Sequence, residues 1–301
     1  MQAKAKNMLY DWFVTFRKEG FTEWNSSPYL PIDTLGFGSL YAFAQDPAMR
    51  ELGREGMDFA YYLLAVHSQQ GIFASSSGRT YIKEQFGNWS NCPSGLSWIG
   101  YGYGVPGHAG KGIPSSCLSD YEPPKEFAQW FSIPRGKEMI CQTTQGNDGY
   151  VDLYTYKTAD YMMTSANDFH PGEPGHQENP FQLTFNAVAQ LWVTHPGERV
   201  LFGAARPSYW AGNGTLPKVN QYKAFAGLIY DIAPEHPVDF THLYLPSMEF
   251  DRCEVEGKWA FVQLGSAYAA VYCSNGMRMQ DFGSNKDREC IAEGRRCIWL
   301  G

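Results

Sequence analysis

Residues 259–272, WAFVQLGSAYAAVY, set the fold of the larger part of this chain. Two runs rich in aromatic and apolar residues flank Gly265-Ser266, a compact turn signal, and this pattern predicts two antiparallel strands joined by a tight turn. Similar runs recur from about residue 127 onward, with no helical segments between them, at 151–153, 161–165, 181–185, 191–194, 225–229, 240–245, 259–264 and 268–272. Many short strands with glycine-containing turns predict a large antiparallel β-sandwich over residues 127–301.

Residues 1–85 follow a helical period instead. The first predicted helix spans residues 4–18, where four large apolar residues recur on one face: Leu9, Trp12, Phe13 and Phe16. The second begins at Pro31, a favoured first-turn residue, and its inward face is predicted to carry Ile32, Leu35, Leu40 and Phe43. The third begins after the Asp46-Pro47 cap signal, with an inward face of Leu52, Phe59, Leu63 and Val66. The fold class is therefore predicted to be α+β, with a short helical region before the sandwich.

Residues 86–126 join these two regions. They are rich in glycine, serine, proline and aromatic residues, and they have no helical period. A loop of this length in a compact chain is usually functional or disordered, and the aromatic content argues against simple disorder. We predict a linker here, and no internal repeat is evident elsewhere.

Composition excludes several classes of protein. The 301 residues are 44% hydrophobic and 18% charged, which is typical of a globular chain. The net charge of −7 and the lack of a Lys/Arg cluster argue against nucleic-acid binding. No apolar run reaches about 18 residues, so no membrane span is predicted, and the start MQAKAKNMLYDWF lacks the apolar core of a signal peptide. Esterase, nucleotidase and dehydrogenase fingerprints are also missing.

Seven cysteines, Cys92, Cys117, Cys141, Cys253, Cys273, Cys290 and Cys297, form no CxxC pair, which argues against a zinc ribbon. The odd count leaves at least one thiol free if the others pair. Cys253 and Cys273 would meet across a strand meander, but the sequence assigns no pairing. Three glycosylation sequons begin at Asn25, Asn88 and Asn213.

Two segments of the helical region carry candidate catalytic groups. The loop Trp24-Asn25-Ser26-Ser27-Pro28-Tyr29 offers an amide that would hydrogen-bond a sugar carboxylate, or else it is a helix-capping loop. His67, at a helix end, precedes Arg79 and Tyr81 across a Ser/Gly loop. A His, an Arg and a Tyr brought together suit proton abstraction beside a uronate carboxyl, because a cation neutralises the carboxylate and lowers the pKa of the phenol. The structural alternative is a capped, salt-bridged loop.

Two further segments lie in the sandwich region. The first is the loop 165–179, where a metal bound near His170, His176 and Glu178 is the less favoured reading and a polar inter-strand loop the preferred one. The second surrounds Tyr209 and Trp210, which are typical of a sugar-stacking loop and equally common in plain sandwiches. Carboxylate pairs of the kind used by glycoside hydrolases are also present: Glu23 with Asp33, and Glu173 with Glu178.

The order of helices, aromatic-rich linker and antiparallel sandwich resembles the heparinase II/III-like polysaccharide lyases, which combine an α/α toroid with a β-sandwich. The similarity rests on three places. The loop with Trp24, Asn25 and Tyr29 looks like the helical loop that carries a carboxylate-neutralising amide, and His67 with Arg79 and Tyr81 looks like the His and Tyr part of the lyase site. The run 175–179, GHQEN, looks like that group's Gly-His-Ala-Asp segment.

The chain departs from the family in two ways. Gln177 and Glu178 replace the expected Ala and Asp, which puts the group's structural zinc site in doubt, so no cofactor is expected. Residues 1–85 also supply fewer helices than a complete toroid, and we expect the native chain to extend upstream of Met1. The resemblance implies a secreted or periplasmic protein.

The resemblance implies a lyase that cleaves a uronate-containing acidic polysaccharide or oligosaccharide by β-elimination. Asn25 and Arg79 would neutralise the carboxylate, Tyr81 would act as base or acid, and His67 would be its partner. Substrate contacts are expected from Trp24, Tyr29, His176, Tyr209 and Trp210. The alternatives are a glycoside hydrolase that uses a carboxylate pair and a non-catalytic carbohydrate-binding or structural protein.

Overall fold

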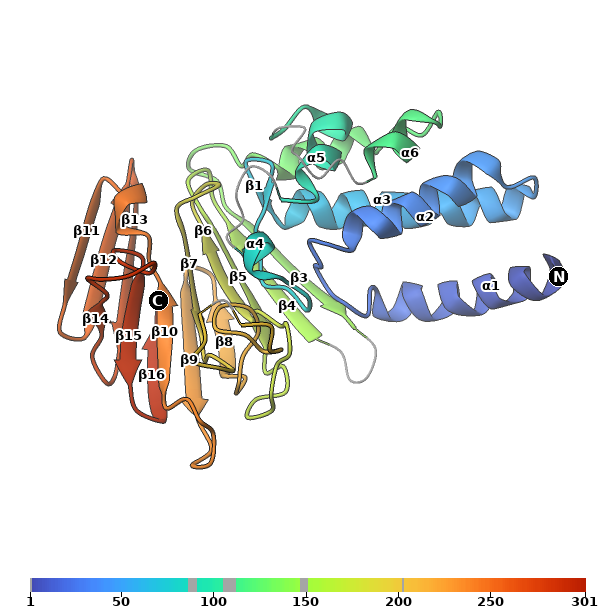
Figure 1. Ribbon diagram of the computed structural model, residues 1–301. Helices are drawn as coiled ribbons and strands as arrows, with labels where there is room; N and C mark the ends of the chain where they lie inside the picture. The colour runs from blue at the N-terminus through green and yellow to red at the C-terminus, as the bar shows by residue number, and fades with distance from the viewer. Residues whose placement is uncertain (1, 86–90, 105–111, 147–150, 202) are drawn as a thin grey trace.

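The protein consists of an N-terminal helical region followed by two large antiparallel sheets (Figure 1). The computed structural model describes residues 2–85, 91–104, 112–146, 151–201 and 203–301. None of the described helices is both long and apolar enough to cross a membrane. The helices and the short hairpin between them are α1 (Gln2–Glu19), α2 (Leu30–Phe43), α3 (Pro47–Val66), β1 (Ser68–Gln69), β2 (Ile72–Phe73), α4 (Ile82–Gln85), α5 (Ser94–Tyr101), α6 (Ile113–Cys117) and the 3-10 helix η1 (Lys125–Trp130).

The three long helices begin and end close to the predicted positions, but the inward face of α2 was predicted wrongly. Ile32, Leu35 and Phe43 are 43%, 46% and 64% exposed, whereas Phe37 is buried. The cause is the close packing of α2 against α3. A Cβ added to Gly56 of α3 would lie only 2.4 Å from the ring of Phe37 on α2. Small residues on α3 therefore select the face of α2 that packs inward.

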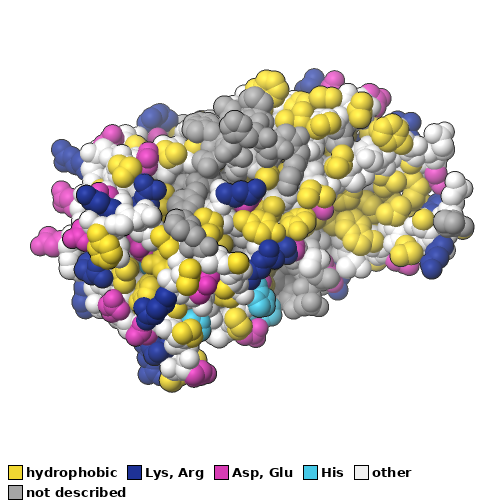
Figure 2. Space-filling view, viewed as in Figure 1, with side chains coloured by type: hydrophobic (Ala, Val, Ile, Leu, Met, Phe, Trp, Pro, Cys, Tyr) yellow, Lys and Arg dark blue, Asp and Glu magenta, His cyan; other side chains and the backbone are white. Residues whose placement is uncertain are grey.

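Helix α1 is attached mainly through two aromatic side chains. Phe13 and Phe16 are its buried residues, and both contact Phe37 of α2 at ring-centroid distances of 5.9 and 5.7 Å. Trp12, predicted to face inward, is 45% exposed. Figure 2 shows hydrophobic side chains gathered on the surface over α1 and α2.

Fourteen strands form the two large sheets. The eight-stranded sheet has the order β14-β15-β10-β7-β6-β5-β4-β3, and the six-stranded sheet has the order β11-β12-β13-β16-β9-β8. Their bounds are β3 (Met139–Gln145), β4 (Val151–Lys157), β5 (Met162–Asn167), β6 (Phe181–Thr184), β7 (Gln190–Thr194), β8 (Lys218–Tyr222), β9 (Phe225–Asp231), β10 (Phe240–Tyr244), β11 (Arg252–Glu256), β12 (Trp259–Leu264), β13 (Ala267–Cys273), β14 (Arg278–Met279), β15 (Glu289–Glu293) and β16 (Arg296–Leu300). The predicted antiparallel sandwich is confirmed.

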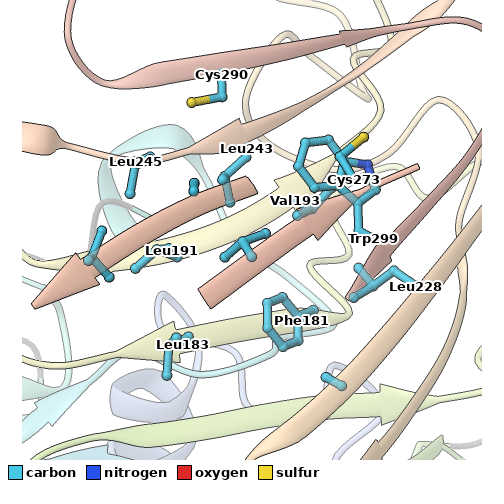
Figure 3. Close-up of a cluster of buried hydrophobic side chains, with 14 of the residues drawn as sticks. Phe181, Leu183, Leu191, Val193, Leu228, Leu243, Leu245, Cys273, Cys290 and Trp299 are labelled. Carbon is cyan, nitrogen blue, oxygen red and sulfur yellow. The ribbon is translucent and has the colours of Figure 1, made fainter. Parts of the chain in front are cut away.

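The main core lies between the two sheets. Side chains that alternate along the strands meet there, among them Phe181, Leu191, Leu243 and Trp299 (Figure 3). Because successive residues of a strand point to opposite faces, the intervening positions of the eight-stranded sheet face away from this core. Those positions are also buried but polar, including Thr164, Gln182, Thr184, Gln190 and Thr194.

The region predicted as a linker contains regular structure. Helix α5 and the shorter α6 lie within residues 86–126, where no helical period was found. Leu96 of α5 is 1% exposed and belongs to the same core cluster as α3. Glycines in an eight-residue helix dilute the apolar period, so tertiary packing decides its conformation.

Candidate active site

The polar face of the eight-stranded sheet holds the segment that carries Arg79 and Tyr81. The hydroxyl of Thr184 donates to the carbonyl of Ala74 at 2.7 Å, and the backbone N–H of Ser76 donates to the hydroxyl of Thr164 at 2.7 Å. Ser77 then forms a two-way backbone bridge with Asn179. These hydrogen bonds fix the backbone of residues 74–77. The fixed backbone in turn sets where the following side chains, those of Arg79 and Tyr81, begin.

A second segment, residues 175–179, pairs with the first. The N–H of Thr80 donates to the carbonyl of Gln177 at 3.0 Å, and the Gln177 amide donates back to the carbonyl of Thr80 at 3.2 Å. A third segment joins through a backbone bridge between Gly175 and Asn213. Gly212 has φ +84, and a Cβ there would lie 2.3 Å from the carbonyl oxygen of His176, so glycine permits this approach.

Arg79 lies at the centre of a group of polar side chains. Its guanidinium donates to Glu23 Oε1 at 2.7 Å, to the Tyr81 hydroxyl at 3.3 Å and to the Tyr29 hydroxyl at 3.4 Å. The guanidinium carbon also lies 5.0 Å from the centre of the Tyr29 ring. The predicted meeting of Arg79 with Tyr81 is thus present, and Tyr29 and Glu23 join them.

The phenol of Tyr81 is tuned by positive charge on two sides. The hydrogen bond from Arg79 lowers the pKa of Tyr81 below its usual value, and partial burial opposes this shift. Tyr29 and the guanidinium of Arg206, which lies 5.6 Å from the Tyr81 ring centre, lower the pKa further. Nearby cations stabilise a phenolate, so Tyr81 is a suitable proton-transfer group.

Tyr81 borders a cavity of about 680 Å³, which also contains His176 and Arg206. His176 Nδ1 lies 3.1 Å from the carbonyl oxygen of Arg206. A carbonyl only accepts, so Nδ1 carries the proton and donates it, and in the neutral ring Nε2 has a free lone pair. The cavity therefore combines a phenol, an imidazole and a guanidinium, with Lys83 at its border.

The charge of this cavity is positive on balance. Lys83 pairs with Glu84 at 3.2 Å, and Arg79 pairs with Glu23 at 2.7 Å. Arg206 has no carboxylate partner within 4 Å in the described part of the chain. An unpaired guanidinium beside a phenol is suited to binding a carboxylate or sulfate.

The expectation that His67 shares this cavity is wrong. His67 is 1% exposed, and its Nδ1 lies 2.9 Å from the Thr155 hydroxyl beneath the end of α3. Burial, and then the charge of Lys157, lower the pKa of His67 to about 3. A neutral, enclosed imidazole cannot exchange protons with a bound glycan.

Asn25 and Trp24 are also enclosed, at 2% exposure each. Asn25 accepts from the Gln145 amide at 3.2 Å and donates to the carbonyl of Ser76 at 3.4 Å, so it supports the backbone of the site segment. Trp24 packs against Phe169 with ring centroids 5.4 Å apart. The predicted contacts of these two side chains with substrate are not available in this conformation.

Tyr209 and Trp210 belong to a core cluster and not to a sugar-stacking loop. They are 8% and 3% exposed. Trp210 stacks on His242 at 4.2 Å, and the Tyr209 hydroxyl donates to Glu289 at 2.6 Å. The aromatic signal in this segment reflects packing on the polar face of the sheet.

The less favoured metal site also lacks its ligand geometry. His170 pairs with Glu173 at 3.5 Å, whereas His176 bonds to a backbone carbonyl and Glu178 accepts from the N–H of Gln177. Over the described ranges no group of three or more His, Cys, Asp or Glu side chains is close enough to hold a metal ion.

Each of the two predicted carboxylate pairs lines one cavity. Glu173 and Glu178 line a cavity of about 360 Å³. Glu23 and Asp33 line another of about 310 Å³, next to Tyr29. Burial, and then the negative charge of Glu23, raise the pKa of Asp33 to about 7. Glu23 is bonded to Arg79 at 2.7 Å, whereas Asp33 has its pKa raised, so the two carboxyl groups lie in different environments.

Arg206 was not predicted to be a site residue. His176 was predicted to contact substrate but not to be catalytic. Both residues were noted within longer segments, but nothing in their spacing indicates that residues 176 and 206 meet residue 81. The backbone bridges between the three segments bring them together, and these bridges depend on glycine positions that resemble ordinary turns.

Comparison with family models, with curated proteins and with solved structures finds no significant match for this chain.

Proposed function

We propose that this chain is a polysaccharide lyase that cleaves a uronate-containing glycan by β-elimination at the cavity formed by Tyr81, His176 and Arg206. The observation that carries the proposal is the phenol of Tyr81 between two guanidinium groups at the border of a 680 Å³ cavity. In β-elimination the proton beside the uronate carboxyl is removed, the C4–oxygen bond breaks, and a C4–C5 double bond forms. The reaction needs a cation, a base and an acid.

In this proposal Arg206 binds the uronate carboxylate. Of the two described cations that line this cavity, Lys83 pairs with Glu84, whereas Arg206 pairs with no described carboxylate. Neutralising that carboxylate makes the adjacent C–H more acidic and stabilises the charge that develops as the proton leaves. Arg79 is held by Glu23 and acts mainly on Tyr81. Tyr29 fixes the same guanidinium from its other side.

His176 replaces His67 as the proposed partner of Tyr81. Its Nε2 lone pair takes the proton, and the Tyr81 hydroxyl donates to the leaving oxygen. The reverse assignment, with a Tyr81 phenolate as base, fits the same geometry. The cavity border also carries apolar side chains, including Pro28 and Ile82, that would contact the sugar ring.

The test is incubation with a panel of uronate glycans while the ultraviolet absorbance of the unsaturated uronate product is followed. Wild-type protein should generate this absorbance, and Tyr81→Phe should reduce the rate by at least about 100-fold. His176→Gln should give a loss of similar size. Tyr268→Phe is a matched control, because Tyr268 is 70% exposed on the six-stranded sheet and should keep full activity.

A glycoside hydrolase that uses Glu23 and Asp33 is the second candidate, favoured by the raised pKa of Asp33. It would release new reducing ends without the absorbance, and Asp33→Asn would abolish the release. Glycan binding without either product would contradict both enzymatic proposals and would favour a carbohydrate-binding protein.

A further inference from the structure

Two cysteines meet in the interior of the sandwich, far along the chain from the candidate active site. Cys273 ends β13 and Cys297 lies on the neighbouring strand β16, and their sulfur atoms are 3.2 Å apart. The two residues are 0% and 2% exposed. Figure 3 shows Cys273 among the core side chains, beside Trp299. Both are free thiols, and the sulfur that Cys273 contacts is that of Cys297, so the suggested meeting of Cys253 with Cys273 is wrong.

We propose that Cys273 and Cys297 form a disulfide bond that ties the last strand, β16, to β13 when a small disulfide oxidant is present. A disulfide requires sulfur atoms about 2 Å apart, so the two thiols must approach by only about 1 Å. The backbone on both sides is already fixed, because the N–H of Ser274 donates to the carbonyl of Ile298 at 2.9 Å. Side-chain rotation can supply this movement without displacing either strand.

The pairing of β16 with its two neighbours is uneven, and this gives the bond a structural effect. Its register with β9 extends from Arg296 to Leu300, whereas its register with β13 consists only of Tyr272 with Leu300 and Cys273 with Trp299. A covalent bond between residues 273 and 297 would reinforce the shorter of the two ladders. It would also close a loop that contains β14 and β15, which limits the freedom of the unfolded chain.

In the folded chain, hydrogen bonds from Cys273, and then from Thr241 and Ser274, lower the pKa of Cys297 to about 7 despite burial. Because both thiols are enclosed there, exchange with glutathione disulfide takes place during refolding, before the sheets close over the pair. The Cys297 thiolate attacks one glutathione sulfur and releases one glutathione thiol. The Cys273 thiol then loses its proton and attacks the Cys297 sulfur of the mixed disulfide, releasing the second glutathione thiol.

The other cysteines contact different groups. Cys290 lies 3.9 Å from the sulfur of Met279, Cys141 bonds to the Tyr62 hydroxyl, and Cys117 is exposed. Cys253 lies close enough to Cys290 to raise its pKa, after the larger effect of burial. Among the described residues, the sulfur contact between Cys273 and Cys297 is the one seen at hydrogen-bond distance between two of these thiols. The proposed bond is independent of the proposed catalytic function, since neither cysteine borders the cavity of Tyr81.

The experiment is oxidative refolding of the full chain in a mixture of reduced and oxidised glutathione, followed by acid quenching and alkylation of the remaining thiols. The reduced chain should take up alkyl groups on all seven cysteines, and the oxidised chain should take up two fewer. Trypsin places Cys273 in the peptide 259–278 and Cys297 in the peptide 297–301, with Cys253 and Cys290 in other peptides. Mass spectrometry should find these two peptides joined and separable by reductant.

Thermal unfolding gives a second measurement. The oxidised chain should unfold at a higher temperature than the same sample after reduction, and Cys297→Ala should remove this difference. Cys117→Ala is the control and should retain it. Alkylation of all seven cysteines after oxidative refolding, or a link from Cys273 to Cys253, would overturn the proposal. The wild-type peptide map decides the question even if Cys297→Ala does not fold.

Discussion

Lys157 is fully buried on β4 although lysine is among the most strongly hydrated side chains. Its Nζ donates to the carbonyls of Ala65 and Trp130 at 3.1 and 2.5 Å, which satisfies acceptors at the end of α3 and in the 3-10 helix. Burial lowers its pKa from 10.5 to about 7. The proton therefore binds more tightly to the unfolded chain than to the folded one.

We predict that Lys157 adds a positive slope to the free energy of unfolding between about pH 7 and 10.5, because in this window the unfolded chain holds the Lys157 proton more tightly than the folded chain does. The contribution of Lys157 should approach about 1 kcal/mol per pH unit at its steepest. Lys157→Met should remove this slope. Urea unfolding at several pH values measures it, and Lys258→Met, in an exposed turn, should leave the slope unchanged. Equal slopes in the wild type and Lys157→Met would contradict the prediction.

Glu289 anchors a second buried network, on the polar face of the eight-stranded sheet. It accepts from His242 Nδ1 and the Tyr209 hydroxyl at 2.6 Å each and from the Asn285 amide at 2.7 Å. His242 Nε2 lies 2.7 Å from the Thr194 hydroxyl. The order hydroxyl, imidazole, carboxylate resembles that of a hydrolase triad, but all three side chains are 0% exposed, so the network serves the core.

We expect Glu289→Gln to lower the free energy of unfolding by about 3 kcal/mol, because it removes the buried carboxylate that accepts hydrogen bonds from His242, Tyr209 and Asn285. Burial raises the pKa of Glu289, but the bonds from His242, Tyr209 and Asn285 outweigh it and lower the pKa below 4.5. The wild type should therefore lose this stability as the pH falls through that lowered value, and the variant should lose less. Glu293→Gln, exposed on the same strand, is the control in chemical denaturation. A loss below about 1 kcal/mol, within the ordinary surface range, would refute this role.

Single residues also explain which parts of the site the sequence could reveal. Arg79 and Tyr81 are two positions apart, so their meeting follows from local chain geometry. His67 lies twelve positions before Arg79, on the other side of the β1–β2 hairpin. Nothing in this spacing indicates that its side chain is buried against Thr155 at the end of α3. His176 and Arg206 reach Tyr81 only through backbone bridges between distant segments, which carry no sequence period.

At the scale of elements, the contact between α2 and α3 depends on glycines of α3. A Cβ on Gly53 would lie 2.5 Å from the backbone nitrogen of Tyr41, and backbone cannot move aside without separating the helices. By contrast, a Cβ on Gly36 of α2 would have no heavy atom within 4 Å. The two positions are thus a matched pair of helical glycines that differ only in their surroundings.

We predict opposite effects of the same substitution at this pair. Gly36→Ala should raise the free energy of unfolding by up to about 1 kcal/mol, since alanine is the better helix former. Gly53→Ala should lower it by about 1–3 kcal/mol, because overpacking outweighs the gain in helix propensity. Thermal unfolding measures both. Stabilisation by Gly53→Ala would show that the helices pack less closely than the structure indicates.

The same scale shows which elements the sequence could predict. The central strands β5, β6, β7 and β10 are buried on both faces and are rich in apolar and β-branched residues, so they were predictable. Strands β3, β8, β11 and β14 were missed, and each lies at an edge of its sheet. The interior strands β15 and β16 were also missed. Edge strands carry charged and polar side chains, as in the run RCEVE of β11, and such runs lack an apolar period.

For the whole molecule, the helical region and the sandwich have separate apolar cores, but polar side chains of the eight-stranded sheet join the two regions. The eight-stranded sheet is covered on one face by the six-stranded sheet and on the other partly by residues from the first 85 positions. Lys157 bonds to Ala65, Thr155 to His67, and Thr184 to Ala74. Each of these polar side chains of β4 and β6 therefore has a hydrogen-bond partner among the N-terminal residues.

We therefore predict that residues 127–301 expressed alone will not fold cooperatively, although they contain both large sheets. Removing residues 1–126 takes away His67 and Ala74, the partners of Thr155 and Thr184, and leaves Lys157 with Trp130 as its one remaining partner of the two described above. It also exposes the second face of the sheet, which favours aggregation. Removing only residues 1–19 is the matched control. Helix α1 is held mainly by Phe13 and Phe16, so that shorter chain should keep a single unfolding transition at a lower temperature. Circular dichroism during heating compares the two, and a sharp transition for residues 127–301 alone would mean that the sandwich is an autonomous domain.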